Sequence, residues 1–207
     1  MDQSRTAVPV TWKALQAGIP KCTRCDLYRF ATQAVSGEGS RRAHIVFIGE
    51  QPGDQEDLQG RPFVGPAGKL LDRALEDASI DRGDVFVTNA VKHFKFEERG
   101  KRRIHKKPSA GEVQACQVWL EAELLLIKPE VIVCLGATAA RSVLGASFRL
   151  TQHRGEFQEH RWAPYVTATI HPSAILRAPD DDSRHREYDA FVADLRAVKS
   201  KSRGSQK

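Results

Sequence analysis

The sequence predicts an α/β fold in three layers, with helices on both faces of a central, mostly parallel, four-stranded sheet. Two observations predict it: short apolar runs alternate with stretches of helical periodicity, and the apolar runs are continuous rather than alternating. Continuous apolarity is typical of strands that are buried on both sides. We therefore expect one domain over residues 1–198, followed by a disordered polar tail over residues 199–207.

The predicted elements follow one another along the chain in the order of such a fold. The strands are expected at His44–Gly49, Val85–Ala90, Val131–Gly136 and Tyr165–Ile170. The helices are expected at Ala67–Ala78, Ser109–Ile127, Ala137–Leu144 and Arg184–Val198. Ser109, with Glu112 three residues later, has the pattern of a helix-starting capping box.

The positive charge of the chain is concentrated in one segment. Between Lys92 and Lys107, eight Lys or Arg against two Glu give a local charge of +6, equal to that of the whole chain. Such a patch favours a polyanionic partner. The first eleven residues have no apolar run typical of a signal peptide, and no segment is apolar enough to span a bilayer. We expect a cytoplasmic monomer without a membrane partner.

Four cysteines in an intracellular chain indicate metal ligands or buried thiols rather than disulfides. Cys22 and Cys25 are separated by two residues, and with Cys116 on a predicted helix they suggest a metal site. Counting cysteines alone would make Cys134 the fourth ligand. However, Cys134 lies inside a predicted strand, where a free cysteine acts as a small apolar residue. The spacing leaves zinc and iron–sulfur both open.

Polar residues follow or end three of the predicted strands. Glu50 follows the first strand, Asn89 lies at the end of the second, and His171 follows the fourth. Ligands of open α/β sheets bind beyond the carboxyl ends of the strands. We therefore expect these three side chains to converge on one site.

Taken in order, the motifs around these residues resemble those of the uracil-DNA glycosylase superfamily, most closely its iron–sulfur branch, family 4. The resemblance extends from Cys22 to about Leu195. It rests on Cys22-x-x-Cys25, Gly49-Glu50-Gln51-Pro52-Gly53, Gly60-Arg61-Pro62-Phe63-Val64-Gly65, Thr88-Asn89-x-x-Lys92 and His171-Pro172-Ser173. Each motif alone is weak because Gly and Pro occur in most loops, whereas five in the family's order are specific.

Three departures from ordinary family 4 resemble the UdgX subgroup, whose members bond covalently to uracil-containing DNA. Gln51 stands where those enzymes carry a small residue, and His93 stands where they carry a cluster cysteine. The segment Gly100–His105, which ends in the run KRRIH, is expected to be an inserted basic loop.

The resemblance implies that the protein flips uracil out of DNA and excises it, releasing free uracil. Phe63 would stack on the base, and Asn89 would bond to its Watson–Crick edge, because an amide offers both a donor and an acceptor. His171 would stabilise the negative charge that develops on uracil O2. In the UdgX interpretation, His105 attacks C1′ of the deoxyribose and stays attached to it, while Glu50 accepts the other ring N–H.

The resemblance also implies the remaining contacts. Gln51 and Asp54 are expected to position the basic loop or the sugar. DNA contacts are expected from Lys92, Lys101, Arg102, Arg103, Ser173 and Arg177. A 4Fe–4S cluster is expected on Cys22, Cys25, His93 and Cys116. The expected substrate is uracil-containing DNA, single-stranded by preference, with duplex DNA left open.

Two alternatives stay open at this point. The first is an ordinary family 4 glycosylase that turns over, in which His105 only contacts phosphate. The second is an iron–sulfur protein without enzymatic activity that binds nucleic acid or senses redox state, which would leave Glu50, Asn89 and His171 without a task.

Overall fold

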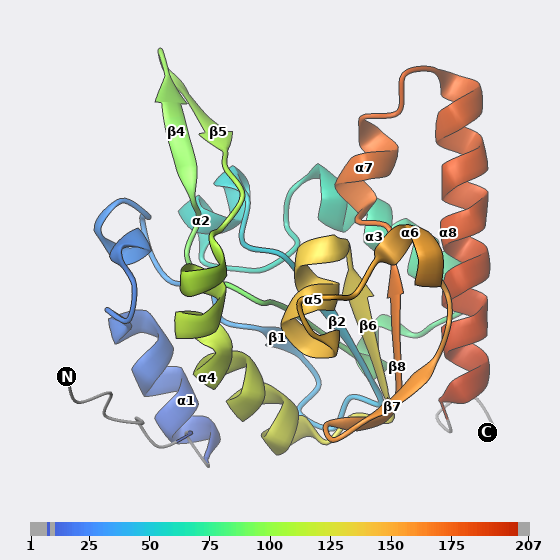
Figure 1. Ribbon diagram of the computed structural model, residues 1–207, viewed down its shortest axis with the longest axis horizontal. Coiled ribbons are helices and arrows are strands. Elements are labelled where there is room, and N and C mark those ends of the chain that lie inside the picture. The colour runs from blue at the N-terminus through green and yellow to red at the C-terminus, as the bar shows by residue number, and fades with distance from the viewer. Residues whose placement is uncertain (1–7, 9–10, 203–207) are drawn as a thin grey trace.

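A six-stranded sheet lies at the centre of the protein, with helices on both faces (Figure 1). The computed structural model describes residue 8 and residues 11–202. The sheet order is β1-β3-β2-β6-β8-β7. Its interior strands are β2 (Ile45–Gly49), β3 (Val85–Asn89), β6 (Val131–Leu135) and β8 (Ala163–Thr169), which pair in parallel. The predicted three-layer fold and its parallel strands are confirmed.

Two short strands at the edges correct the expected number of strands from four to six. They are β1 (Glu38–Gly39), antiparallel to β3, and β7 (Gln158–His160), antiparallel to β8. Both are polar and partly exposed, so no apolar run marks them in the sequence.

The interior strands are buried on both faces because their alternate side chains enter two separate cores. On one face Val46, Ile48 and Ile132 pack among residues of α4 (Ala110–Ile127) and α5 (Ala137–Leu144). On the other, Phe47 and Val133 pack among residues of α3 (Pro66–Asp77) and α8 (Asp181–Lys201). This two-sided burial accounts for the continuous apolar runs.

Smaller helices complete the layers. They are α1 (Trp12–Gly18), which packs against α4, α2 (Asp54–Gln59), α6 (Leu150–His153), α7 (Pro172–Leu176), and the 3₁₀ turns Ile19–Lys21, Asp26–Arg29 and Arg82–Asp84. The predicted capping box is present, with Ser109 and Glu112 each accepting a backbone N–H of the other. Among the described residues, no helix combines the length and the apolarity needed to cross a membrane.

Helix α8 is longer than predicted and corrects the expected start of the tail. It begins at Asp181, behind the cap Asp180, and continues to Lys201. Residues 199–201 are therefore helical rather than disordered. Residues 203–207 of the expected tail lie outside the described residues.

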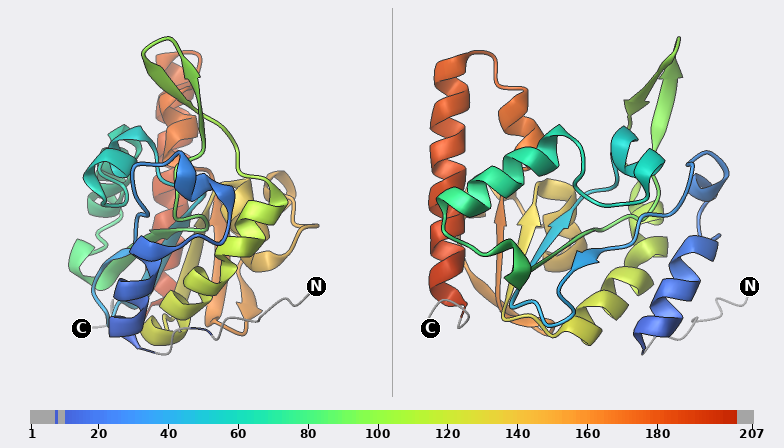
Figure 2. Two further views of the ribbon diagram at one scale, coloured as in Figure 1. Left: turned by 90° about the vertical axis from the view of Figure 1, so that its left-hand side faces the viewer. Right: turned by 180° about the vertical axis from the view of Figure 1, so that it is seen from behind.

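The expected basic loop is instead a two-stranded hairpin, formed by β4 (Phe96–Arg99) and β5 (Arg102–His105). It projects from the body of the protein in all three views (Figures 1 and 2). Gly100, at φ 60°, provides the left-handed turn residue. In the hairpin register Phe96 lies opposite His105, and Glu98 lies opposite Arg103.

Candidate functional site

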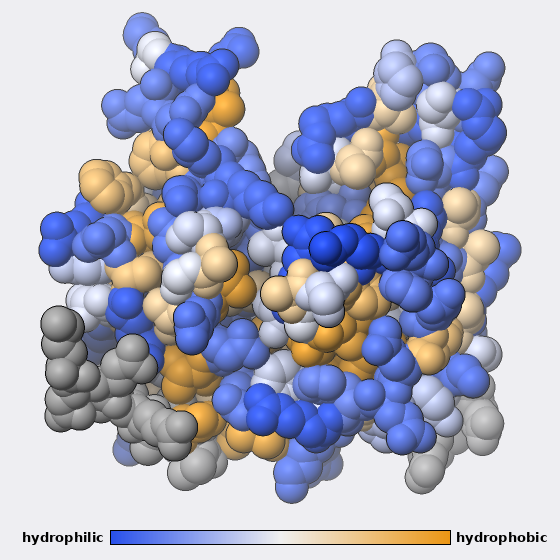
Figure 3. All heavy atoms as spheres, in the orientation of Figure 1, coloured by the Kyte–Doolittle hydropathy of each residue, from blue (hydrophilic) through white to orange (hydrophobic). Residues whose placement is uncertain are grey.

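A cavity of about 820 Å³ lies beyond the carboxyl ends of the parallel strands. It opens between the β4–β5 hairpin and the α7 region, where the space-filling view shows a hollow between two hydrophilic projections (Figure 3). Glu50, Asn89 and His171 all line it, as do Phe63 and His105. The expected convergence of the strand ends is therefore confirmed, and it follows from the parallel register of β2, β3 and β8.

Asn89 presents a buried amide to this cavity. It is 4% exposed, and within the described residues its side-chain amide makes no hydrogen bond. Gly49 pairs with it across β2 and β3. A Cβ at Gly49 would lie 2.3 Å from Asn89 Oδ1 and 2.9 Å from Phe63 Cζ, so only glycine leaves room for both side chains. The amide is thus held next to an aromatic ring with its donor and acceptor free.

Phe63 sits in a strained loop above the same strands. Its φ of 57° lies in the left-handed region, which a phenylalanine rarely adopts. Gly68 permits the conformation, because a Cβ there would lie 1.6 Å from the Phe63 carbonyl oxygen. Buried Glu56 fixes the next turn by accepting the Gly65 N–H at 3.0 Å. The surrounding contacts keep the loop in this conformation, with the ring at the cavity. The role of Glu56 was not predicted from the sequence.

His171 is held in one tautomer. The Ser173 N–H donates to His171 Nδ1 at 3.1 Å, so the ring proton of a neutral imidazole is on Nε2. Burial, and next the electrostatic effects of Arg177 and His105, lower the pKa of His171 to about 4. The ring is therefore neutral at physiological pH and offers an N–H donor. It lies 6.2 Å from the Phe63 ring, centroid to centroid, at 27°.

Ser173 and Arg177, two of the expected DNA contacts, both line the cavity. The Ser173 hydroxyl lies 2.8 Å from His171 Nδ1, so this residue contacts the imidazole as well as facing the opening. Arg177 is exposed just beyond the end of α7.

His105, at the end of β5, reaches the cavity from the hairpin. Its Nε2 lies 3.3 Å from Glu50 Oε1, the contact that a tautomer-fixing role for Glu50 requires. The His105 side chain is 51% exposed, compared with 22% for Glu50. The ring also packs near Phe94, at a centroid distance of 6.2 Å. The histidine at the end of the projecting hairpin and the carboxylate that follows β2 therefore share one wall of the site.

Gln51 ties the hairpin to the sheet. Its Nε2 donates to the carbonyls of Lys95 at 3.0 Å and Lys106 at 3.1 Å, and its Oε1 accepts the Lys95 N–H at 3.1 Å. The amide thus clamps both strands of the hairpin where they leave the body of the protein. A small residue at this position would make none of these bonds.

Arg103 is a second clamp. Its guanidinium bonds to Asp54 Oδ1 at 2.7 Å and to Asp57 Oδ2 at 2.6 Å, and it lies over the rings of Phe94 and Phe96. The expected DNA contact of Arg103 is therefore corrected, because its donors are engaged within the protein. Asp54, expected among the catalytic residues, lines the cavity but pairs with Arg103, which agrees with its expected role in positioning the basic segment.

Lys101 and Arg102 differ from Arg103. They lie at the tip of the hairpin, are exposed, and form no ion pair within the described part of the chain. These two cations are free to meet a polyanion.

Lys92 is the clearest correction to the predicted site. It was expected to contact DNA, yet its side chain is completely buried and pairs with Glu123 at 2.7 Å. Its Nζ also donates to Thr88 Oγ1 and to the Asn89 carbonyl. Nothing in the sequence near Lys92 pointed to Glu123, which lies on α4.

Cys134 lies apart from the other three cysteines, in the core where it was expected. Cys134 is fully buried in the sheet core, and burial raises the pKa of its thiol. Cys22, Cys25 and Cys116 gather in a separate cluster beside α1 and α4. The indole N–H of Trp119 donates to Cys22 Sγ at 3.1 Å, and the Lys92 N–H donates to Cys116 Sγ at 3.2 Å.

His93, the fourth expected ligand, is buried, and its Nδ1 has no hydrogen-bond partner among the described residues. A buried ring nitrogen without a hydrogen-bond partner is unusual, because such groups are nearly always paired. In the described residues, no group of three or more His, Cys, Asp or Glu side chains is arranged to hold a metal ion as it stands. The donor chemistry of three thiols and an imidazole fits both an iron–sulfur cluster and zinc.

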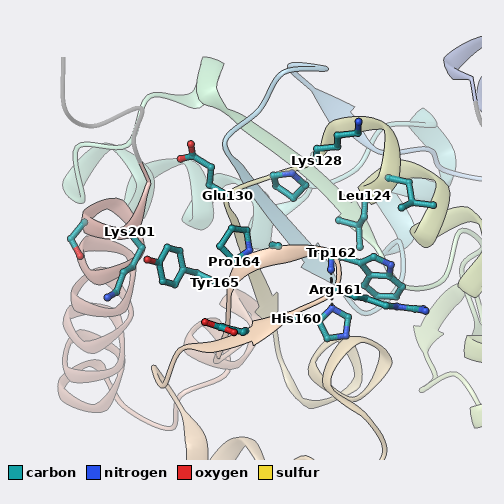
Figure 4. A pocket seen from close by; sticks show the side chains of 14 residues that line it. Leu124, Lys128, Glu130, His160, Arg161, Trp162, Pro164, Tyr165 and Lys201 are labelled. Carbon is teal, nitrogen blue, oxygen red and sulfur yellow. Dashed lines mark hydrogen bonds between the residues drawn. The ribbon is translucent and has the colours of Figure 1, made fainter.

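A second hollow, of about 1160 Å³, lies at the opposite end of the sheet, beside the first residues of β6 and β8. Figure 4 shows its walls, where Arg161 lies over the Trp162 ring and Lys201 over Tyr165. Of the predicted site residues, none is among those that line it. The residues predicted to handle the base and the sugar instead line the cavity at the carboxyl end of the sheet.

Comparison with known proteins agrees with this geometry. The sequence model of the uracil DNA glycosylase superfamily matches residues 36–196. The type-4 uracil-DNA glycosylase of Thermotoga maritima is 40% identical over 80% of this chain and 83% of the relative. Those of Archaeoglobus fulgidus and Pyrobaculum aerophilum are 39% and 34% identical, each over 78% of this chain, and over 81% and 82% of their own lengths.

Proposed function

Because the chain belongs to the uracil-DNA glycosylase superfamily, we propose that it excises uracil from DNA in the cavity beyond β2, β3 and β8. One observation carries this proposal: Phe63, Asn89 and His171 converge on that cavity from three separate segments of the chain. A base inside a duplex is out of reach of such a cavity, so the nucleotide must be flipped out or be single-stranded.

Each of the three side chains has a task on the flipped base. Phe63 stacks on it, and Asn89 uses its free amide to accept from N3–H and donate to O4 of uracil. Cytosine presents the inverted pattern at these positions. His171, kept neutral by burial, donates its Nε2–H to uracil O2, where negative charge develops as the glycosidic bond breaks.

We assign to His105 the covalent step that the UdgX resemblance implies. The glycosidic bond breaks with its electron pair leaving on uracil, and the free ring nitrogen of His105 forms a bond to C1′. Glu50 accepts the proton on the other nitrogen, and the departing uracil takes up one proton. The contact of His105 with Glu50 at the cavity wall supports this assignment.

The turning-over alternative fits the relatives equally well, since the names of those compared are type-4 uracil-DNA glycosylases. In that version Glu50 accepts a hydrogen bond from the water that attacks C1′, and His105 contacts a phosphate. A denaturing gel separates the two after incubation with uracil-containing single-stranded DNA. A shifted band that survives detergent and heat supports the adduct, whereas abasic DNA without a shift supports turnover.

The variant His105→Ser sharpens this test. We expect it to lose the shifted band while still releasing uracil, because water can then reach C1′. If uracil release is lost together with the shift, His105 is not simply the trapping nucleophile. Intact uracil with the unaltered protein contradicts both enzymatic versions and favours the nucleic-acid-binding or redox-sensing alternative.

We propose that Lys101, Arg102, Ser173 and Arg177 hold the DNA backbone around the cavity. The two hairpin cations stand on one side of the opening, and Ser173 and Arg177 stand on the other. Uracil-containing single-stranded DNA is the expected substrate, free uracil is the product, and a cytoplasmic monomer is the expected form.

We propose a 4Fe–4S cluster on Cys22, Cys25, Cys116 and His93, supported by the three gathered cysteines and the unpaired His93 Nδ1. Such a cluster would tie the chain before β1 and the start of the hairpin segment to α4. Brown colour, visible absorbance and four irons per chain support it. Stoichiometric zinc without colour would assign the site to zinc instead.

A further inference from the structure

A buried ion pair lies directly behind the base-recognition residue. Lys92 Nζ donates to Glu123 Oε2 at 2.7 Å, Thr88 Oγ1 at 2.7 Å and the Asn89 carbonyl at 2.9 Å. An ammonium has three N–H donors, so each has one acceptor. Both charged side chains are 0% exposed. The network is therefore complete and dry.

Glu123 joins three parts of the fold. Its Oε2 accepts from Lys92 and Thr88, while its Oε1 accepts the Gly37 N–H at 3.0 Å. The pair thus connects α4 with β3 and with the chain that enters β1. A buried ion pair is weak evidence of net stabilisation, because removing both charges from water costs about as much as their attraction returns. A role in fixing one conformation accounts better for its presence.

The conformation that it fixes is that of Asn89. At the end of β3, the next two N–H groups bond to β2 and the loop behind it, Ala90 to Gly49 and Val91 to Glu50. The Asn89 carbonyl is held by Lys92. Lys92 holds the Asn89 carbonyl on one side, and the Asn89 amide packs against Gly49 on the other. The Asn89 side chain therefore has little conformational freedom.

We propose that Lys92 and Glu123 are positioning residues that hold Asn89 in register for uracil. This inference rests on the proposed function. Lys92 touches no substrate, and acts through the Asn89 peptide. Its own N–H donates to Cys116 Sγ, so one residue links the base-reading strand to the cysteine cluster.

The test uses the paired substitution Lys92→Met with Glu123→Gln, which removes both charges while keeping the volume of both side chains and the bond to Gly37. Rates of uracil release are measured with excess protein over uracil-containing single-stranded DNA, for the unaltered protein, the pair, Asn89→Ala and the triple variant. We expect the pair to slow release at least tenfold at saturation, with the half-saturating protein concentration unchanged within twofold.

The triple variant decides whether the effect passes through Asn89. If it does, the paired substitution slows Asn89→Ala by less than twofold, since the group it positions is already gone. The inference would be overturned if the rate loss of the triple variant equalled the product of the losses from the paired substitution and from Asn89→Ala. It would also be overturned if the paired variant released uracil as fast as the unaltered protein. Leu195→Ala, in the core on the other face of the sheet, is the matched control for lost stability and should keep its rate.

Failure of the proposed function is a separate result. It would appear as no uracil release by the unaltered protein under any of these conditions. Visible absorbance and thermal unfolding of each variant report whether the cysteine site and the fold survive the substitutions.

Discussion

Lys92 and Arg103 belong to the same basic segment, and both bind carboxylates, yet the structure gives them different environments. The Lys92 side chain is 0% exposed and pairs with a carboxylate that is equally dry. The Arg103 side chain is 20% exposed and pairs with one half-exposed and one buried aspartate. The first fixes a strand inside the core, and the second fastens a hairpin to its surface.

The difference between them shows that the charge of a segment does not tell where its charges act. Of the cations near the hairpin, Lys101 and Arg102 remain exposed without an ion pair in the described residues. Lys92 and Arg103, two of the four DNA contacts expected in this segment, instead pair with carboxylates inside the protein. Stability and DNA affinity should therefore respond to different cations of this segment.

The largest expected effect follows from breaking the buried pair on one side only. Lys92→Met leaves the Glu123 carboxylate buried without its cation, which should lower the free energy of unfolding by about 3–5 kcal/mol. Urea denaturation measures the loss. The paired variant with Glu123→Gln should recover most of the lost free energy of unfolding. If Lys92→Met alone were as stable as the unaltered protein, the Glu123 carboxylate would not be in a water-free environment.

His171 extends the comparison to a group without a carboxylate partner, because burial is the largest cause of its lowered pKa. Its pKa falls from 6.5 to about 4 on folding, so between these values the unfolded chain binds more protons. The resulting stability is present in full above pH 6.5 and is lost as pH falls towards 4, by about 3 kcal/mol at most.

The measurement is denaturant unfolding at several pH values across this window. His171→Gln should remove that part of the pH dependence and leave the rest. If the two proteins lose stability in parallel between pH 6.5 and 4, His171 is not the group responsible.

Arg103→Met tests the surface clamp. It leaves Asp57, which is 0% exposed, with only its bonds to the Thr32 N–H, so we expect a loss of about 1–3 kcal/mol. It should also slow the step that needs His105, because the hairpin is less firmly held. Arg102→Met is the matched control, and an equal loss of stability in the control would show that Arg103 has no special role.

The smallest effect on stability, within about 0.5 kcal/mol, is expected for Lys101→Ala with Arg102→Ala. Their effect should appear in DNA binding. The slope of log affinity against log salt concentration should become shallower by about 0.7 for each single-strand phosphate contact that is lost. An unchanged slope would place the DNA path away from the hairpin tip.

The sequence predicted the fold well because buried strands appear as apolar runs within a few consecutive residues. The four interior strands were found within about two residues at each end, since burial on both faces demands continuous apolar runs. The edge strands and the hairpin were missed as strands because polar, half-exposed pairing leaves no such mark.

The basic segment was less predictable from the sequence. The sequence alone determined that Glu50, Asn89 and His171 lie at strand ends, and hence that they meet, because parallel strands end at one edge. The neighbours of Lys92 in the chain do not show that it is internal, because its partner Glu123 lies 31 residues away on another element. The sequence around a charged side chain does not show whether that side chain is solvated or buried in an ion pair. Packing between elements far apart in the chain determines its environment.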